Sequence, residues 1–343
     1  MRQVLACLFA ILISHSAAAE VPAQRLATLS RGVNLIDVFS DKKPLPALLN
    51  DLTTIQRNGF RHVRFFLDPA WVWRPGEPQR LDQVLKAAFA AKLGVIICMQ
   101  SYVKEFKDDP VVIDRWTTAW KQIAAHYAKS DPDRLFFELV NEPPGTDVPR
   151  WAAIQEALRR NVRAIVPHHT LLLTGAPTST SSALATLPPS EDDNVAYVFH
   201  VYAPMIFSHQ GADWADPAFG TVHGLQYPPN PDNIEAIRRR ISPSRQADLT
   251  EYAKLGRGII TREIEVANGW GRKYNVPLVV TEFGVYRAAA PPQSRAAWLR
   301  DVRQTLEHDK IGWTIWEYNG GFGIKPELDL GCGDLPASLG LCH

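Results

Sequence analysis

The chain has 343 residues, 46% of them hydrophobic, so it can bury a large core and is neither disordered nor collagen-like. Its 37 basic and 36 acidic residues nearly cancel, which argues against a nucleic-acid partner or an anionic membrane partner. A neutral polar substrate is the more natural expectation.

The N-terminal segment has the pattern of a secretory signal. A basic start with Arg2 is followed by an apolar stretch of about a dozen residues and by three alanines, Ala17 to Ala19, before Glu20. We expect residues 1–19 to be a cleaved signal peptide, because the apolar stretch is too short to span a bilayer. An uncleaved anchor is the alternative. The mature protein, residues 20–343, is then secreted or periplasmic and has no membrane partner.

Eight short apolar runs follow in the mature chain. Several are continuously apolar rather than alternating, which suits strands of a parallel sheet that is covered on both faces. The runs occupy residues 31–36, 62–67, 94–100, 135–142, 170–175, 195–202, 277–284 and 311–318.

The segments between the runs carry helical periodicity. Residues 81–88, 112–128 and 150–166 each place apolar side chains three or four apart, on one stripe. Eight strands alternating with helices predict an α/β fold, a single-domain (β/α)8 TIM barrel. Some 75 residues separate the sixth and seventh runs, so we expect a long insertion after strand 6, with short helices at 233–242 and 248–256.

Two of the predicted strands end in an acid. Asn141 and Glu142 close the fourth run before Pro143 and Pro144, which cannot extend a hydrogen-bonded ladder, and Glu282 closes the seventh. In a barrel these two glutamates would face each other across the mouth, as paired carboxylates do in glycoside hydrolysis. Either glutamate alone has an ordinary explanation, as a helix cap or as the partner of an arginine. The pair at matching strand ends favours catalysis.

The motifs FELVNEP and VVTEFGV resemble those of glycoside hydrolase family 5, the cellulase A family of retaining (β/α)8-barrel enzymes. The resemblance covers nearly all of the mature chain. It implies that Glu142 is the general acid/base, that Glu282 is the nucleophile and that Asn141 binds the sugar 2-hydroxyl. Further positions match the family in the same order: Arg64 in HVRFF, His200 and Tyr202 in FHVYAP, and Trp316, on which a sugar stacks, in WTIWEY.

Each partner of the two acids has a physical role. Arg64 and Tyr202 would favour ionised Glu282 through a permanent charge and a donated hydrogen bond. Glu142 must start protonated, so we expect it in a less polar environment or near negative charge. His200 either bonds the acid or substrate hydroxyls, or is a satisfied histidine packed at a strand end.

Other positions bear on sugar recognition. Gln100 stands where the family usually has a histidine; it can bond a sugar hydroxyl but carries no charge, which puts the details of recognition in doubt. Trp71 and Trp73 after the second strand and Trp214 in the insertion offer faces for sugar stacking, although tryptophans also serve the core. Glu317 is a further acid near the mouth.

The cysteines suggest an oxidising compartment. Cys332 and Cys342 enclose a short loop, for which a disulfide is expected, whereas Cys98 lies in an apolar run and is expected to be an inert buried thiol. No zinc-binding spacing is present, and we expect no metal and no cofactor.

These features predict a retaining glycoside hydrolase that acts on a β-glucan polysaccharide or oligosaccharide, with endo-β-1,4-glucanase as the first choice. A β-mannanase or an exo-β-1,3-glucanase would use the same two glutamates and stays open. A barrel that only binds polysaccharide is the alternative from another class, and it would be expected to lack one of the acids. Motifs of serine hydrolases, zinc proteases, phosphate loops and dinucleotide folds are absent.

Overall fold

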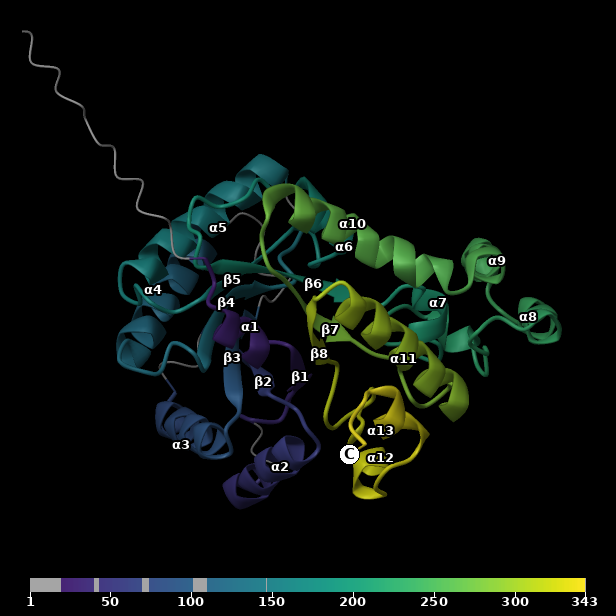
Figure 1. Cartoon of the computed structure of the whole chain (residues 1–343). Coiled ribbons are helices and arrows are strands. Elements are labelled where there is room, and N and C mark those ends of the chain that lie inside the picture. The colour runs from purple at the N-terminus through teal and green to yellow at the C-terminus, as the bar shows by residue number, and fades with distance from the viewer. Residues whose placement is uncertain (1–19, 40–42, 70–73, 101–109, 146, 343) are drawn as a thin grey trace, which may run out of the picture.

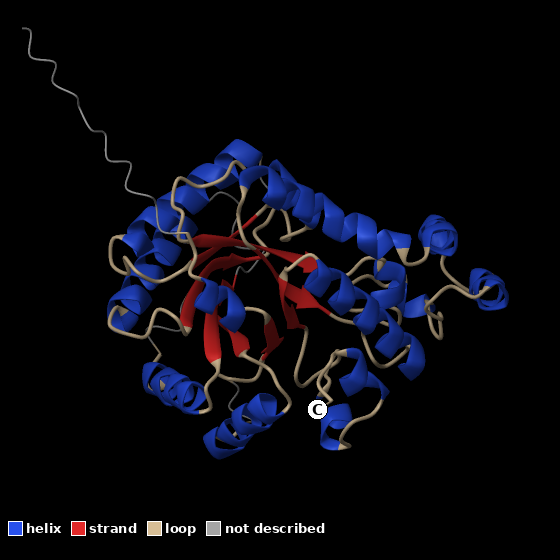
Figure 2. Cartoon of the chain, viewed as in Figure 1, coloured by secondary structure: helices blue, strands red, loops and turns tan. Residues whose placement is uncertain are grey.

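The computed structural model describes residues 20–39, 43–69, 74–100, 110–145 and 147–342, and its centre is a closed barrel of eight parallel strands (Figure 1, Figure 2). Each strand pairs with its neighbour in the chain, and β8 pairs with β1, which confirms the predicted (β/α)8 barrel. The eight apolar runs correspond to β1 (Arg31–Asn34), β2 (His62–Leu67), β3 (Gly94–Gln100), β4 (Leu135–Asn141), β5 (Leu171–Thr174), β6 (Val195–Val201), β7 (Leu278–Phe283) and β8 (Gly312–Ile315).

Side chains fill the barrel interior, so it is a core and not a pore. At its N-terminal end the buried His62 ring donates from Nδ1 to the Thr28 carbonyl (3.0 Å) and bonds Thr314 Oγ1 through Nε2 (2.8 Å). A Cβ at Gly32 would lie 2.0 Å from His62 Nε2, so only glycine leaves room for the ring. The short helix α1 (Ala23–Thr28) covers this end, in front of the strands in Figure 1. The apolar part of this inner core is Leu29, Ile96, Phe136, Leu172, Ala196, Val198 and Val279.

A ring of helices packs around the barrel (Figure 2). The three helices expected from periodicity are confirmed as α3 (Glu77–Ala90), α4 (Pro110–Tyr127) and α5 (Val148–Arg163). Indole groups tie two of them to strand ends: Trp120 of α4 donates to the Leu139 carbonyl (2.9 Å) and Trp151 of α5 to the Thr174 carbonyl (2.7 Å). The ring consists of α2 (Leu45–Arg57), α3 (Glu77–Ala90), α4 (Pro110–Tyr127), α5 (Val148–Arg163), α6 (Ser181–Thr186), α10 (Gly258–Tyr274) and α11 (Pro292–His308). None of the helices described is both long and apolar enough to cross a membrane.

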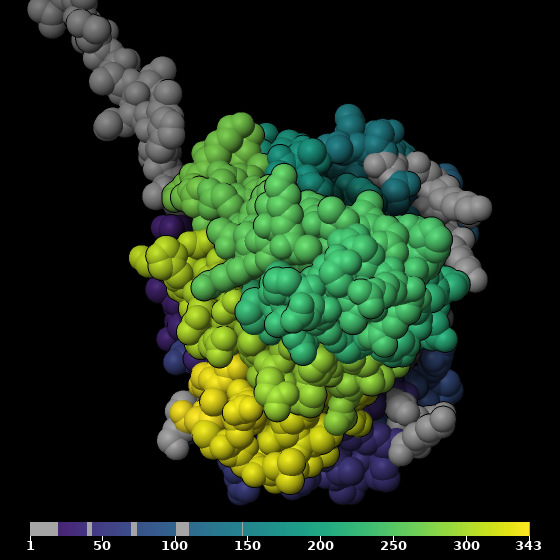
Figure 3. Space-filling model, turned by 90° about the vertical axis from the view of Figure 1, so that its right-hand side faces the viewer, coloured from purple at the N-terminus to yellow at the C-terminus, as the bar shows by residue number. Residues whose placement is uncertain are grey.

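The segment between β6 and β7 extends to one side of the barrel (Figure 1), and this side faces the viewer in Figure 3. The two expected short helices are present as α8 (Pro231–Arg238) and α9 (Gln246–Leu255). The helix α10, which the sequence pattern does not single out, is the regular outer helix between β6 and β7. The insertion is therefore shorter than the 75 residues between the runs. A small aromatic core of Phe207, Tyr227 and Tyr252 holds it together. Its elements are α7 (Met205–Ser208), η2 (Phe219–Thr221), α8 (Pro231–Arg238), η3 (Pro243–Arg245) and α9 (Gln246–Leu255).

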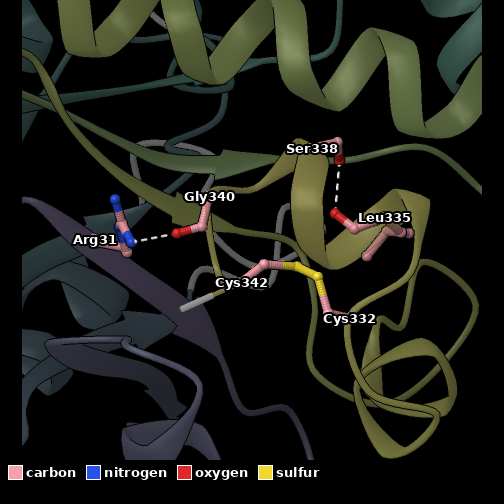
Figure 4. Close-up of a disulfide and its surroundings, with 6 residues drawn as sticks. All are labelled: Arg31, Cys332, Leu335, Ser338, Gly340 and Cys342. Atoms are coloured by element: carbon pink, nitrogen blue, oxygen red, sulfur yellow. Dashed lines mark hydrogen bonds between the residues drawn. A yellow bond between two sulfur atoms is a disulfide. The ribbon is translucent and has the colours of Figure 1, made fainter.

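The C-terminal segment folds back onto α11 through α12 (Lys325–Asp329) and α13 (Asp334–Ser338). A disulfide joins Cys332 to Cys342, with 5.4 Å between their Cα atoms (Figure 4). Arg31, at the start of β1, donates to the Gly340 carbonyl at 2.9 Å, which places this tail at the N-terminal end of the barrel.

Candidate active site

A bulge at the end of β4 turns Asn141 toward the mouth of the barrel. Cys98 of β3 pairs with Glu138, but Gln100 pairs with Asn141, so β4 contains one residue more than β3 over this interval. Such an extra residue re-aims the side chain that follows it. The Asn141 amide consequently meets Gln100 and donates from Nδ2 to its Oε1 at 3.2 Å.

Glu142 follows β4 in a left-handed backbone conformation, with φ at 41°. Thr178 and Ser179, in the loop after β5, share this conformation, with φ of 54° and 52°. The two segments are joined, because the Glu142 N–H donates to Ser179 Oγ at 3.2 Å. Non-glycine residues in this region cost about 1–3 kcal/mol each and cluster at functional sites, so the rest of the fold must hold Glu142 in place. The sequence pattern does not single out Ser179.

A second bulge places Glu282 at the mouth. Phe199 of β6 pairs with Val280, but His200 pairs with Glu282, so β7 contains the extra residue here. Glu282 is only 5% exposed. It therefore depends on protein groups rather than on bulk water for its hydrogen bonds.

Arg64 and Tyr202 supply these bonds. Arg64 Nη1 donates to Glu282 Oε1 at 2.9 Å, and the Tyr202 hydroxyl donates to Oε2 at 2.8 Å. Burial and the nearby carboxylates raise the pKa of Tyr202 well above its usual value, so its hydroxyl stays a donor. The structure thus brings together the three residues that the sequence analysis had associated.

His200 lies between the two glutamates. Its Nδ1 is 2.9 Å from Glu142 Oε1 and 3.6 Å from Glu282 Oε2. These three side chains are the group that could hold a metal ion among the described residues, since one ligand atom of each lies within 4.8 Å of the others. Hydrolysis by two carboxylates requires no metal, and the hydrogen bond between His200 and Glu142 already joins two members of the group.

The pKa shifts of the two acids run against our expectation. Burial would raise the pKa of Glu142, but the hydrogen bond from His200 and the charge of that ring outweigh burial and lower it. Burial raises the pKa of Glu282 despite the charges of His200 and Arg64. Burial likewise opposes a charge on His200, yet the two carboxylates raise its pKa. Glu142 does lie near a negative charge, as expected, since an oxygen of Glu282 is within 4.8 Å of one of its own, but its pKa is lowered in the free protein because His200 lies against it.

Aromatic rings extend from the Glu282 side of the mouth to the surface. We call His209, Trp214, Tyr286 and Phe322 the aromatic shelf. Phe322 contacts the Tyr202 ring at 6.1 Å between centroids, and Trp214 contacts Tyr286 at 6.0 Å and Phe322 at 6.3 Å. Trp214 is 63% exposed, which leaves its indole accessible at the outer end.

Of the remaining predicted residues, the structure describes Trp316 and Glu317 but not Trp71 and Trp73. The Trp316 ring is partly exposed at the mouth and contacts Phe66 at 5.7 Å between centroids. Glu317 is buried, and burial raises its pKa to about 7. Trp71 and Trp73 lie outside the described residues.

Several residues of the site were missed from the sequence. Asn34 Oδ1 accepts from Arg64 Nη1 at 2.8 Å, and Glu138 accepts two hydrogen bonds from the same guanidinium. A signal for Glu138 was present, because it is the only charged residue in the apolar strand β4. No comparable pattern marks Tyr286 or Phe322, which lie in loops.

Residues 45–321 match the family model described as cellulase, glycosyl hydrolase family 5. Among curated proteins, the chain is 32% identical over 235 residues to Endoglucanase 3 of Fibrobacter succinogenes, covering 65% of this chain and 35% of that protein. It therefore spans little more than a third of that relative. It is 27% identical over 286 residues to Endoglucanase C of Acetivibrio thermocellus, covering 78% of this chain and 82% of that protein.

Solved structures agree with the sequence matches. Endoglucanase Cel5A from Thermotoga maritima aligns with a TM-score of 0.73 at 26% identity, covering 92% of this chain and 98% of that one. Structures of that enzyme with cellobiose and with mannotriose align with TM-scores of 0.73 and 0.72. Because the family model covers most of the barrel, the resemblance seen in the motifs is confirmed, and the chain belongs to glycosyl hydrolase family 5, the cellulase family.

Proposed function

We propose that this protein is a retaining endo-β-1,4-glucanase in which Glu142 is the acid/base and Glu282 the nucleophile. The observation that carries the proposal is the spacing of the acids, since an oxygen of Glu142, an oxygen of Glu282 and a ring nitrogen of His200 lie within 4.8 Å of one another. Retaining enzymes separate their two carboxyls by about 5–5.5 Å, whereas inverting enzymes need about 6.5–9.5 Å to fit a water between them.

In the first step, a carboxylate oxygen of Glu282 attacks the anomeric carbon and the bond to the leaving oxygen breaks. Glu142 gives its proton to that oxygen, so the departing sugar leaves with a neutral hydroxyl. In the second step, Glu142 takes a proton from water, whose oxygen attacks the same carbon and releases Glu282 from the ester. Two inversions give net retention of configuration.

His200 supplies the proton arrangement that these steps require. In the free protein the pKa of Glu142 is lowered and that of His200 is raised, so the shared proton favours the imidazole. A bound sugar removes water from Glu142, whose side chain is 36% exposed without it, and desolvation raises the pKa of a carboxyl. The proton then moves over the 2.9 Å hydrogen bond from His200 to Glu142. Substrate binding thus prepares the acid.

Two features support a chain of several sugar units as the substrate. Trp316 and Phe66 form an aromatic contact at the mouth, and the aromatic shelf continues to the exposed Trp214. Aromatic faces stack against the C–H faces of sugars, so the accessible rings of Trp316, Phe66, Tyr286 and Trp214 suit subsites on either side of the cleaved bond, whereas His209 and Phe322 are buried. Asn141 and Gln100, joined to each other, are the polar groups that would bond sugar hydroxyls at the centre.

β-Mannan is the second candidate substrate. The Thermotoga maritima enzyme was solved with mannotriose as well as with cellobiose, and Gln100 replaces a histidine that the family usually has near the cleavage point. A neutral amide binds hydroxyls of either orientation as donor or acceptor. The choice between β-glucan and β-mannan therefore depends on the comparison of substrates described below.

We also propose that residues 1–19 are a cleaved secretory signal and that residues 20–343 form the mature catalytic domain. The disulfide Cys332–Cys342 supports this, because disulfides persist in oxidising compartments such as the periplasm or the cell exterior.

The test compares the reducing ends released from carboxymethyl-cellulose, β-mannan and laminarin, and follows the first-formed anomer by proton NMR. We expect the most product from carboxymethyl-cellulose, with the β-anomer appearing first. An α-anomer would refute the retaining mechanism, and faster release from mannan or laminarin would replace the substrate. Glu142→Gln and Glu282→Gln should each lose activity by several orders of magnitude while keeping the wild-type circular dichroism, since both lie at the mouth.

A further inference from the structure

Glu138 is a buried acid that the double-displacement chemistry does not use. It lies in β4, four residues before Glu142, and none of its surface is exposed. Both of its oxygens accept from Arg64: Oε2 from Nε at 2.6 Å and Oε1 from Nη2 at 2.8 Å. A carboxylate so far from water needs a physical reason, because burying a charge is costly unless it is paired.

The hydrogen bonds of Arg64 show what Glu138 does. A guanidinium has five N–H donors in a rigid plane, and here each has an acceptor. Two go to Glu138, one to Asn141 Oδ1 (2.8 Å), one to Asn34 Oδ1 (2.8 Å) and one to Glu282 Oε1 (2.9 Å). Since Glu138 grips one edge of the plane in a bidentate pair, it fixes the direction of the N–H that reaches Glu282.

Glu138 also balances the charge of Arg64. Arg64 is fully buried, and its nearest ionised partners are Glu138 and Glu282. Without Glu138, the whole charge of the guanidinium would act on Glu282 in a medium of low dielectric. That would lower the pKa of the carboxylate and make it a weaker nucleophile, because basicity and nucleophilic strength fall together.

A structural role alone accounts for the pair less well. Replacing a buried ion pair by apolar side chains of similar volume is often neutral or stabilising, so such a pair is weak support for stability. Apolar side chains of the inner core, among them Phe136 of the same strand and Ile96 of β3, are also present in this part of the barrel. An apolar side chain at position 138 would pack against these residues, but Arg64 would lose the two acceptor oxygens that fix its orientation.

We propose that Glu138 is a positioning residue: it orients Arg64 and takes up part of its charge, so that Arg64 holds Glu282 by a hydrogen bond while the carboxylate stays reactive. The proposal rests on the proposed role of Glu282 as nucleophile. The ionisable groups that interact electrostatically with Arg64 or with Glu282 come from six strands or their ends: His62 (β2), Cys98 (β3), Glu142 (β4), His200 and Tyr202 (β6), Glu282 (β7) and Glu317 (β8).

The experiment measures kcat, KM and the pH dependence of kcat/KM for Glu138→Gln. Removing the negative charge leaves Arg64 free to stabilise ionised Glu282, so the acidic limb of the profile should move to lower pH by about one unit. We expect kcat to fall at least about tenfold with KM nearly unchanged, because the lost interaction acts on the reacting carboxylate. Glu138→Asp keeps the charge with a shorter reach, so it should restore the acidic limb to its wild-type position while kcat recovers only in part.

Asp192→Asn is the matched control. Asp192 also pairs with arginines, Arg159 at 2.6 Å and Arg163 at 2.8 Å, but it precedes β6 at the opposite end of the barrel from Glu282. The Asp192→Asn substitution should lower the melting temperature without shifting the acidic limb of the kcat/KM profile. A folded Glu138→Gln protein with the wild-type limb and kcat would overturn the proposal.

Two further results separate the possibilities. If Glu138→Gln does not fold, Glu138→Asp decides, since wild-type kcat in that variant overturns the proposal and a lower kcat at constant KM supports it. If Glu282→Gln retains activity, the proposed function fails first, independently of any result at position 138.

Discussion

The hydroxyl of Tyr202 donates to Glu282 Oε2 at 2.8 Å, on the opposite oxygen from the one that Arg64 holds. The carboxylate is therefore clamped from two sides by groups that keep their protons. Both bonds favour the ionised form, against the burial that raises the pKa of Glu282.

Tyr202→Phe removes one of these bonds without changing the ring. A hydrogen bond to a charged group contributes about 1.5–3 kcal/mol, so we expect kcat to fall by roughly ten- to a hundredfold. The pKa of Glu282 should rise, and the acidic limb of kcat/KM should move to higher pH, the reverse of the shift expected for Glu138→Gln. Steady-state kinetics between pH 4 and 8 measure both effects. An unchanged acidic limb would show that the hydroxyl does not act on Glu282.

The aromatic shelf predicts a loss that depends on substrate length. Trp214 is 63% exposed, so Trp214→Ala should fold normally but lose stacking worth about 0.5–1.5 kcal/mol, or up to roughly tenfold in KM for long oligosaccharides. A short aryl glycoside that does not reach the shelf should be cleaved at the wild-type rate. Leu330→Ala is the control, because Leu330 is also an exposed apolar residue (88%) but belongs to the C-terminal segment. An equal loss on both substrates would show that Trp214 does not act by stacking with the outer sugars of a long oligosaccharide.

The barrel could be predicted because its strands are continuously apolar and its outer helices carry regular stripes. The ends of β4 and β7 were also predictable, since prolines or a glycine follow Glu142 and Glu282 closely. The bulges that aim Asn141 and Glu282 were not, because one extra residue in a strand leaves no mark in composition.

Other parts of the site depend on contacts between distant segments. Phe322 joins the shelf because Arg295 of α11 donates to the carbonyls of Phe322 and Gly323 at 2.7 and 2.8 Å. The order of the acid pKa values was predicted wrongly for a similar reason, since it is the position of His200 against Glu142 that reverses it. The motif identified both residues but did not give their spacing.

The disulfide should contribute to stability but not to catalysis. Cys332 and Cys342 are 10 residues apart, and closing a loop of this size restricts the unfolded chain by about 3 kcal/mol. The double variant Cys332→Ser/Cys342→Ser should therefore melt at a lower temperature. Its kcat should equal that of the wild type, because the tail packs near Arg31 at the end of the barrel away from the mouth. Reduction of the wild-type protein should reproduce the effect, and a fall in kcat without a change in melting temperature would contradict it.

Three buried histidines predict a loss of stability in weak acid. Burial lowers the pKa of His62, His169 and His209 from 6.5 to about 4 in each case. Between these values the unfolded chain binds more protons than the folded one, so the free energy of unfolding falls as the pH is lowered from 6.5 toward 4. His200 does not affect this slope, because its pKa is raised and its own contribution therefore changes only above pH 6.5.

The slope of the free energy of unfolding against pH tests whether these histidines cause the loss of stability. Each can contribute up to about 1.4 kcal/mol per pH unit within this window, so His169→Gln should flatten the dependence by roughly a third. His308→Gln is the control, since that side chain is 86% exposed and its partner, Asp309, is its neighbour in the chain. Chemical denaturation at intervals between pH 4.5 and 7 gives the free energies directly. A flat wild-type profile above pH 5, where most carboxyls remain ionised, would mean that these rings accept protons without unfolding the barrel.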